Sequence, residues 1–166
     1  MVVVLRAVTV MNYPLLIDFK GTLFCQGFVA EVKAGGRLVA SEYAPDDWWL
    51  YGVNPGAIAA SGDSLDAAHE QFRVAMREIL VRFATEAASF AAFKRETESF
   101  FLSTNEPANA DWHVAVDRVR TYKECLGDLP IRSAASRVFV DVIEKKIDQV
   151  MPSDNTVSAD LAKAAV

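Results

Sequence analysis

Four carboxylates in the first part of the chain could support metal-dependent chemistry. Asp18, Glu31, Glu42 and Asp63 lie in or beside segments whose apolar patterns are typical of strands and of a helix start. Carboxylates that converge can hold divalent ions, which activate water for the cleavage of phosphate esters. Because these four have no diagnostic spacing, a divalent-metal-dependent phosphate ester hydrolase that uses Asp18 and nearby carboxylates is the alternative function. The favoured interpretation has no catalytic residue, no metal and no cofactor.

The segment around Asp18 also has a motif-like order. Leu15-Leu-Ile-Asp-Phe-Lys-Gly-Thr-Leu23 resembles the nucleophile motif of haloacid-dehalogenase-type phosphatases, in which an apolar strand ends in Asp-x-Asp-Gly-Thr. Asp18 matches the nucleophile of that motif, and Gly21 and Thr22 match its turn. Lys20 stands where the second Asp would act as general acid and base. The pattern is therefore also explained by a strand that runs into a hairpin.

Histidine and cysteine are scarce. The 166 residues include 2 His and 2 Cys, namely His69, His113, Cys25 and Cys125. Their separation in the sequence does not fit the ligand spacing of a zinc site, and two cysteines are too few for a disulfide framework. We therefore expect no metal centre built from these residues.

The most unusual local composition combines acids with aromatic residues. Asp46, Asp47, Trp48, Trp49 and Tyr51 occur within six positions. Two adjacent Trp side chains cannot both point to one face of a strand, so we expect one of them at the surface or in an interface. Aromatic residues are enriched at protein interfaces, and acids at the rim suit a basic partner. These five residues are the predicted partner-binding site.

Composition limits the class of protein. The chain is 52% hydrophobic, with a net charge of −5 and a pI near 5.0. These values predict one folded domain and make nucleic acid an unlikely partner. The apolar run at residues 2–5 is interrupted by Arg6 and is too short to span a membrane, so we expect a cytoplasmic protein. Residues 1–10 are either an upstream extension or an extra edge strand.

The first third of the chain predicts an antiparallel sheet of three to four strands. Apolar segments at residues 13–19, 23–33 and 37–43 are separated by short, glycine-containing connections, and residues 57–61 could add a fourth strand. The connections are too short for parallel crossovers. Ala34-Gly35-Gly36 is the expected turn between the second and third strands, because glycine readily adopts positive φ.

Helices are predicted in the remainder. The segment from Asp63 to Glu106 has no Gly or Pro and carries an apolar stripe at helical spacing. One unbroken helix would exceed the diameter of a compact chain of this length, so we expect a break within residues 85–89. Asp111 is the expected cap of a third helix. Residues 133–150 are predicted as a fourth helix, with a strand at residues 138–143 as the alternative because that segment is rich in β-branched residues.

Residues 11–84 resemble the HicB antitoxin family through three landmarks in the same order. These are Met11-Asn-Tyr-Pro-Leu-Leu-Ile17 at the start, Gly27-Phe-Val-Ala-Glu-Val32 in the next strand, and Gly62-Asp-Ser-Leu-Asp-Ala-Ala68 at a helix start. Here about 30 residues, from Lys33 to Ser61, separate the last two landmarks, where the family usually has a short segment.

The resemblance implies a fold and a function. The implied fold is α+β: a degraded ribonuclease H-like unit with an antiparallel sheet packed by a long amphipathic helix. The implied function is non-catalytic binding that masks a small basic RNA-cleaving toxin, with a homodimer as a further expectation. The domain organisation would be a HicB-like unit at residues 11–84, a helical extension at 85–151 and a flexible tail at 152–166. No operator-binding module is recognisable in residues 107–166.

Overall fold

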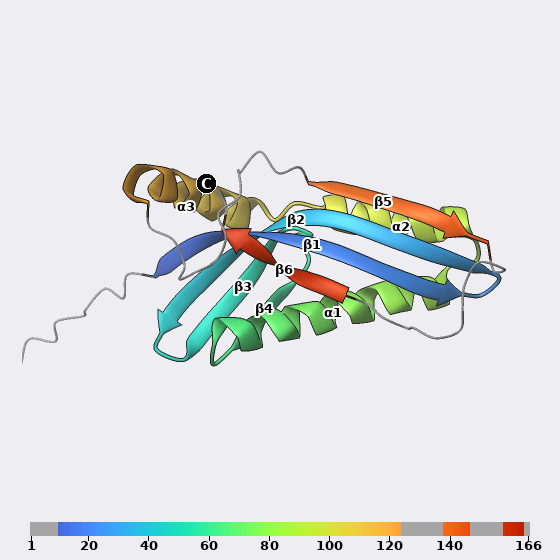
Figure 1. Ribbon diagram of the computed structural model, residues 1–166, viewed down its shortest axis with the longest axis horizontal. Helices are drawn as coiled ribbons and strands as arrows, with labels where there is room; N and C mark the ends of the chain where they lie inside the picture. The colour runs from blue at the N-terminus through green and yellow to red at the C-terminus, as the bar shows by residue number, and fades with distance from the viewer. Residues whose placement is uncertain (1–9, 124–137, 147–157, 165–166) are drawn as a thin grey trace, which may run out of the picture.

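The computed structural model shows an α+β protein with a curled antiparallel sheet and three helices (Figure 1). It describes residues 10–123, 138–146 and 158–164, the last of these as backbone only. The strands are β1 (Met11–Cys25), β2 (Phe28–Ala44), β3 (Asp47–Asn54), β4 (Ala59–Gly62), β5 (Phe139–Lys145) and β6 (Ser158–Ala164). The helices are α1 (Leu65–Glu86), α2 (Phe90–Leu102) and α3 (Glu106–Tyr122).

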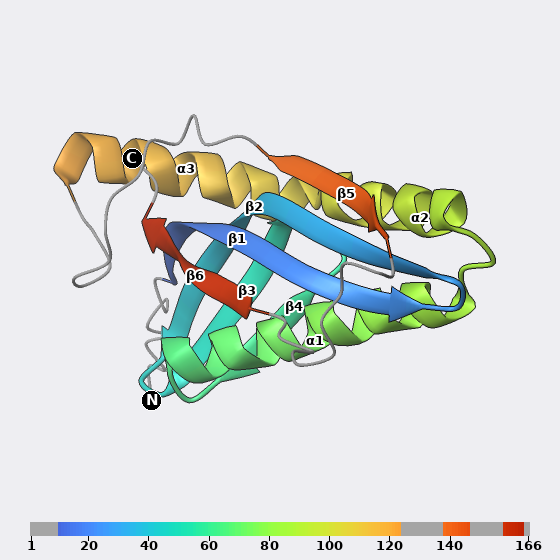
Figure 2. The ribbon, with the colours of Figure 1, turned by 45° about the vertical axis from the view of Figure 1, so that its right-hand side comes forward.

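Strand β2 organises the sheet. The strand order is β4-β3-β2-β1-β6, and all pairings are antiparallel. β1 occupies one edge of β2 along nearly its whole length. The other edge of β2 pairs with β5 over residues 29–35 and with β3 over residues 37–44. Figure 2 shows β5 and β3 following each other along this long strand. The antiparallel α+β class expected from the sequence is confirmed.

The predicted turn at Ala34-Gly35-Gly36 is wrong, because these residues lie inside β2. The β1–β2 hairpin turns instead at Gln26 and Gly27, where Gly27 has a φ of 88°. Gly36 serves a close approach between strands. A Cβ atom there would lie 2.0 Å from the carbonyl oxygen of Asn54 on β3. Gly35 and Gly36 thus mark the place where β3 approaches β2 closely, and the chain does not reverse its direction there.

The predicted break in the long helical segment is confirmed. α1 ends at Glu86, α2 begins at Phe90, and the Ser89 hydroxyl caps α2 by accepting a hydrogen bond from the Ala92 N–H at 3.2 Å. The expectation for the third helix is wrong at its start. The side chain of Asn105, and not that of Asp111, caps α3. Pro107 in the first turn is compatible with this earlier start, because the first N–H groups of a helix lack intrahelical partners.

The fourth helix predicted for residues 133–150 is wrong where the structure describes it. Residues 139–145 form β5, in agreement with the alternative interpretation. Val140 and Val142 pack into the core beside β2, so the open edge of β2 decided between two conformations that the local sequence allowed. Residues 158–164, expected in a flexible tail, form β6 beside β1. The other positions of the predicted fourth helix lie outside the described residues.

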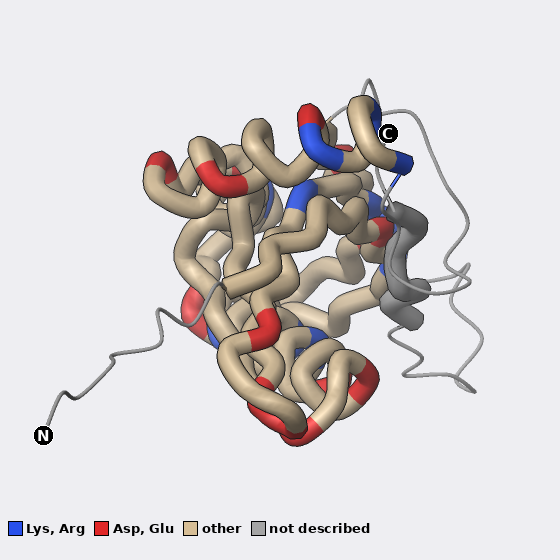
Figure 3. The backbone as a smooth tube through the Cα atoms, turned by 90° about the vertical axis from the view of Figure 1, so that its left-hand side faces the viewer, with Lys and Arg blue, Asp and Glu red and all other residues tan. Residues whose placement is uncertain are grey.

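The sheet lies between two layers of helix (Figure 3). One face packs against α1 and α2 through the larger core, in which Phe72, Met76 and Phe93 are fully buried. The opposite face packs against α3 through a smaller core. Its buried residues are Leu16, Val39, Val53, Ala108, Trp112 and Val116. The candidate site described next lies where α3 begins on this second face.

Candidate functional site

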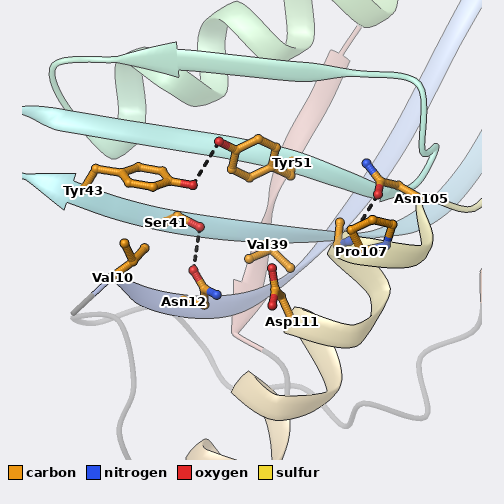
Figure 4. A pocket seen from close by; sticks show the side chains of 10 residues that line it. Val10, Asn12, Val39, Ser41, Tyr43, Tyr51, Asn105, Pro107 and Asp111 are labelled. Carbon is orange, nitrogen blue, oxygen red and sulfur yellow. Dashed lines mark hydrogen bonds between the residues drawn. The ribbon is translucent and has the colours of Figure 1, made fainter. Parts of the chain in front are cut away.

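A groove of about 530 Å³ opens between the sheet and the start of α3 (Figure 4). We call it the tyrosine groove. Side chains from β1, β2, β3 and α3 line it, among them Asn12, Val39, Ser41, Tyr43, Tyr51 and Asp111. Its volume lies within the range of about 300–1,000 Å³ that is usual for ligand pockets. Because alternate residues of a strand face the same side, β2 contributes Val39, Ser41 and Tyr43 to this one surface.

One wall of the groove is aromatic. The Trp49 and Tyr51 rings are stacked, with centroids 5.9 Å apart and an interplanar angle of 12°. The hydroxyl oxygens of Tyr51 and Tyr43 lie 3.2 Å apart and share a hydrogen bond. Burial, followed by the Tyr43 hydroxyl, raises the pKa of Tyr51 to about 12. Tyr51 therefore stays neutral at physiological pH.

The floor is apolar with one internal polar pair. Val39 is 1% exposed, and the buried Ser41 hydroxyl donates to Asn12 Oδ1 at 2.7 Å. At the α3 end of β1, the Arg118 guanidinium donates to the backbone carbonyl of Asn12 and lies 5.7 Å from the ring centroid of Tyr13. The polar groups of the floor are thus fixed before any ligand binds.

The start of α3 is held on the sheet by Asn54. The Asn54 side chain is 3% exposed and accepts hydrogen bonds from Arg37 Nε at 3.1 Å and Nη2 at 2.6 Å. Its Nδ2 donates to the Ser103 carbonyl and to Thr104 Oγ1. The Arg37 guanidinium also lies 4.9 Å from the ring centroid of Trp112 on α3, and burial lowers the pKa of Arg37. These contacts fix the position of α3 and therefore the width of the groove.

The structure places the five predicted partner-binding residues in three groups. Asp46 and Asp47 are exposed at the β2–β3 hairpin, and Trp49 and Tyr51 lie on the α3 side of the sheet. The Trp49 Nε1 donates to Asp47 Oδ1 at 3.1 Å. Trp48 points to the opposite face and packs on Tyr13, with ring centroids 6.2 Å apart. The expectation that the adjacent Trp side chains diverge is confirmed.

Asn12, Tyr43 and Asp111 are among the groove residues that were not predicted from the sequence as site residues. Tyr43 could have been found from the alternation of β2 combined with the two-residue turn at Pro45 and Asp46. Asp111 was assigned a capping role instead. No local signal shows that it faces the sheet, because the packing of α3 decides this.

The carboxylates that could have supported hydrolysis do not converge. Asp18 is opposite Gly35 in the β1–β2 ladder, whereas Glu31 is opposite Thr22, four positions along β1 (22 − 18 = 4). At about 3.3 Å per residue this is about 13 Å, too far for a shared ion. Glu31 is instead paired with Lys33 at 2.8 Å and Lys145 at 2.9 Å. Glu42 lies on the opposite face of the sheet.

Other titratable groups also lie apart. Burial raises the pKa of the Cys25 thiol to about 11, which keeps it protonated. Burial lowers the pKa of His69 on α1. Within residues 10–123 and 138–146 no three His, Cys, Asp or Glu side chains are grouped so that they could hold a metal ion. None of the described helices has the length and apolar character needed to cross a membrane.

In comparisons with protein-family models, curated proteins and solved structures, the chain has no match.

Proposed function

We propose that this protein is a non-catalytic interaction module that binds a basic protein partner through Asp47, Trp49, Tyr51 and the adjoining tyrosine groove. The observation that carries the proposal is the aromatic wall. Trp49 and Tyr51 are stacked, only partly buried, and bordered by the exposed Asp46 and Asp47. Tyrosine and tryptophan anchors with a polar rim are typical of surfaces that bind proteins.

The wall is well suited to docking because it is already ordered. Hydrogen bonds hold Trp49 to Asp47 and Tyr51 to Tyr43. Side chains that are held in place lose less conformational freedom when a partner binds, so more of the contact energy appears as affinity. Asp46 and Asp47 are exposed at the β2–β3 hairpin beside this wall. This charge favours encounter with a positively charged partner.

The finer form of the proposal follows the resemblance of residues 11–84 to HicB antitoxins. In this form the sheet and α1 are a degraded ribonuclease H-like unit, the protein acts in the cytoplasm, and the partner is a small basic RNA-cleaving toxin. Occupation of the partner's RNA-binding surface would then block cleavage. The antiparallel sheet packed by α1 supports this form only at the level of the fold class.

The test begins with the partner. The tagged full-length chain is purified from its native cells beside a Trp49→Ala variant, and any protein retained by the native chain alone is identified and produced separately. We expect a basic protein whose affinity, measured by calorimetry with purified components, falls at least tenfold in the Trp49→Ala variant. Loss of a hot-spot aromatic side chain costs about 2 kcal/mol or more.

A matched control is Val74→Ala, which removes an exposed apolar side chain from α1, away from the groove. This variant should bind like the native chain. If the reconstituted partner binds Trp49→Ala as tightly as the native chain, the proposed surface is wrong. If the partner cleaves RNA and an equimolar amount of this protein does not inhibit it, the antitoxin form is wrong.

A further inference from the structure

We propose that the tyrosine groove takes one arginine side chain of the partner, with the guanidinium between the Tyr43–Tyr51 wall and the Asp111 carboxylate. This inference rests on the proposed function and adds the chemistry of the contact. It names the residue type that enters the groove and a residue, Asp111, that would select it.

The groove contains a carboxylate that can attract a cation. Asp111 on α3 lines the groove, and Figure 4 shows its carboxylate extending from α3 over the floor near Val39. None of the described residues that line the groove is Lys or Arg. The Arg118 guanidinium of α3 contacts β1, where it donates to the Asn12 carbonyl and lies over the Tyr13 ring. Among the described residues that line the groove, Asp111 is therefore the charged one, and its carboxylate attracts a cation.

The start of α3 does not reverse this preference. A helix N-terminus usually favours an anion because its first N–H groups are unpaired. Here the Asn105 N–H donates to the Val53 carbonyl at 3.1 Å, and the Ala108 N–H donates to the Asn105 side chain at 3.1 Å. Pro107 between them has no N–H. The donors of Asn105 and Ala108 are thus occupied and that of Pro107 is missing, which weakens the preference for an anion beside the Asp111 carboxylate.

The shape of the wall favours arginine over lysine. A guanidinium is planar and stacks on aromatic faces, whereas an ammonium is a compact and more strongly hydrated charge. The Tyr51 ring, which stacks on Trp49, lines the groove together with Tyr43, and the two tyrosine hydroxyl oxygens provide acceptors. The Asp111 carboxylate can accept two parallel hydrogen bonds from a guanidinium. The apolar floor at Val39 suits the methylene groups of the arginine stem.

The experiment uses blocked pentapeptides as probes, Gly-Ser-X-Ser-Gly with X as Arg, Lys or Glu. Amide chemical shifts of the full-length chain are followed by NMR at low salt. We expect the Arg peptide to shift the amides of Val39, Tyr51 and Ala108 with a dissociation constant of about 1 mM. The Glu peptide should leave these amides in place, and the Lys peptide should bind at least about threefold more weakly than the Arg peptide.

Two variants complete the test. Asp111→Asn should weaken binding of the Arg peptide at least about fivefold, because it removes the charge and one bidentate acceptor while keeping the shape. Asp117→Asn, on an exposed position of α3 that pairs loosely with Arg120 at 3.9 Å, should leave binding unchanged. Equal binding of the Arg and Glu peptides, tighter binding of the Lys peptide, or no effect of Asp111→Asn would each overturn the inference.

The partner protein separates this inference from the proposed function. If the partner loses affinity for Trp49→Ala but binds Asp111→Asn as tightly as the native chain, the arginine site is wrong and the interaction surface stands. If both variants bind the partner like the native chain, both proposals are rejected.

Discussion

At the scale of single residues, Asn54 makes the hydrogen bonds that hold the start of α3 on the sheet. It accepts from Arg37 and donates to Ser103 and Thr104, so it joins β2, β3 and the segment that leads into α3. We expect Asn54→Ala to lower the free energy of unfolding by about 3 kcal/mol, because a half-buried guanidinium loses its acceptor and two further hydrogen bonds disappear. Urea denaturation monitored by tryptophan fluorescence measures this loss.

The control for that prediction is Thr104→Ala, which removes one hydrogen bond at an exposed position. Its cost should stay below about 1 kcal/mol. A similar cost for both variants would mean that Asn54 contributes only one ordinary hydrogen bond and that α3 is held mainly by apolar packing around Trp112.

At the scale of the elements, the junction between α1 and α2 depends on a cap. The Ser89 hydroxyl satisfies the Ala92 N–H at the start of α2, where Phe90 and Phe93 pack against Phe28 of β2. We expect Ser89→Ala to lower the free energy of unfolding by about 1 kcal/mol. Thermal unfolding of both variants measures this effect. Ser99→Ala, at an exposed position inside α2, should leave the free energy of unfolding unchanged or slightly raised. Equal effects of the two variants would contradict a capping role for Ser89.

The elements that were predicted correctly are those with local causes. The break near Ser89 followed from an apolar stripe too long for a compact chain, and the antiparallel sheet followed from short connections. The errors arose where distant segments decide. Gly35 and Gly36 indicated a turn, but Gly36 allows the close approach of Asn54. The segment around Val142 could be a helix or a strand until β2 offered it an edge.

The residues of the candidate site also differ in whether local sequence or distant contacts determine their position. Trp49 and Tyr51 were predicted because their composition is unusual in a short segment. Tyr43 joins them through the register of the β2–β3 hairpin, and Asp111 through the position of α3 on the sheet. Neither property is encoded within a few residues. Of the residues that line the groove, the predicted site therefore contained Tyr51, and it included Trp48 although the strand turns that side chain to the other face.

At the scale of the whole molecule, Glu31 links β5 to the hairpin of β1 and β2. Its carboxylate pairs with Lys33 on β2 and with Lys145 on β5, and its side chain is 13% exposed. Hydrogen bonds from Lys33 and Lys145 lower the pKa of Glu31 from 4.5 to about 2. A lowered pKa means that the ionised form stabilises the fold above pH 4.5 and that this contribution is lost as the pH falls towards 2.

We therefore expect Glu31→Gln to reduce the free energy of unfolding at neutral pH by about 1–2 kcal/mol, since the two lysines are partly solvated. The difference from the native chain should shrink as the pH falls from 4.5 and vanish near 2. Urea denaturation across this pH range checks the sign. Glu70→Gln, which breaks an exposed pair with Arg73 on α1, should show no such trend. A loss that is constant over this pH range would contradict the ion-pair explanation.

The double use of one edge of β2 has a consequence for shortened forms of the chain. Residues 29–35 of β2 are completed only by β5, which comes from far along the sequence. A shortened chain that stops after α3 would keep the β1–β2 and β2–β3 hairpins and the helices α1, α2 and α3. The backbone N–H and C=O groups of residues 29–35 that face β5 would then have no partner strand. Such bare strands recruit strands from other molecules. Proteolytic nicking or premature termination before residue 139 would thus convert an intramolecular pairing into a template for aggregation.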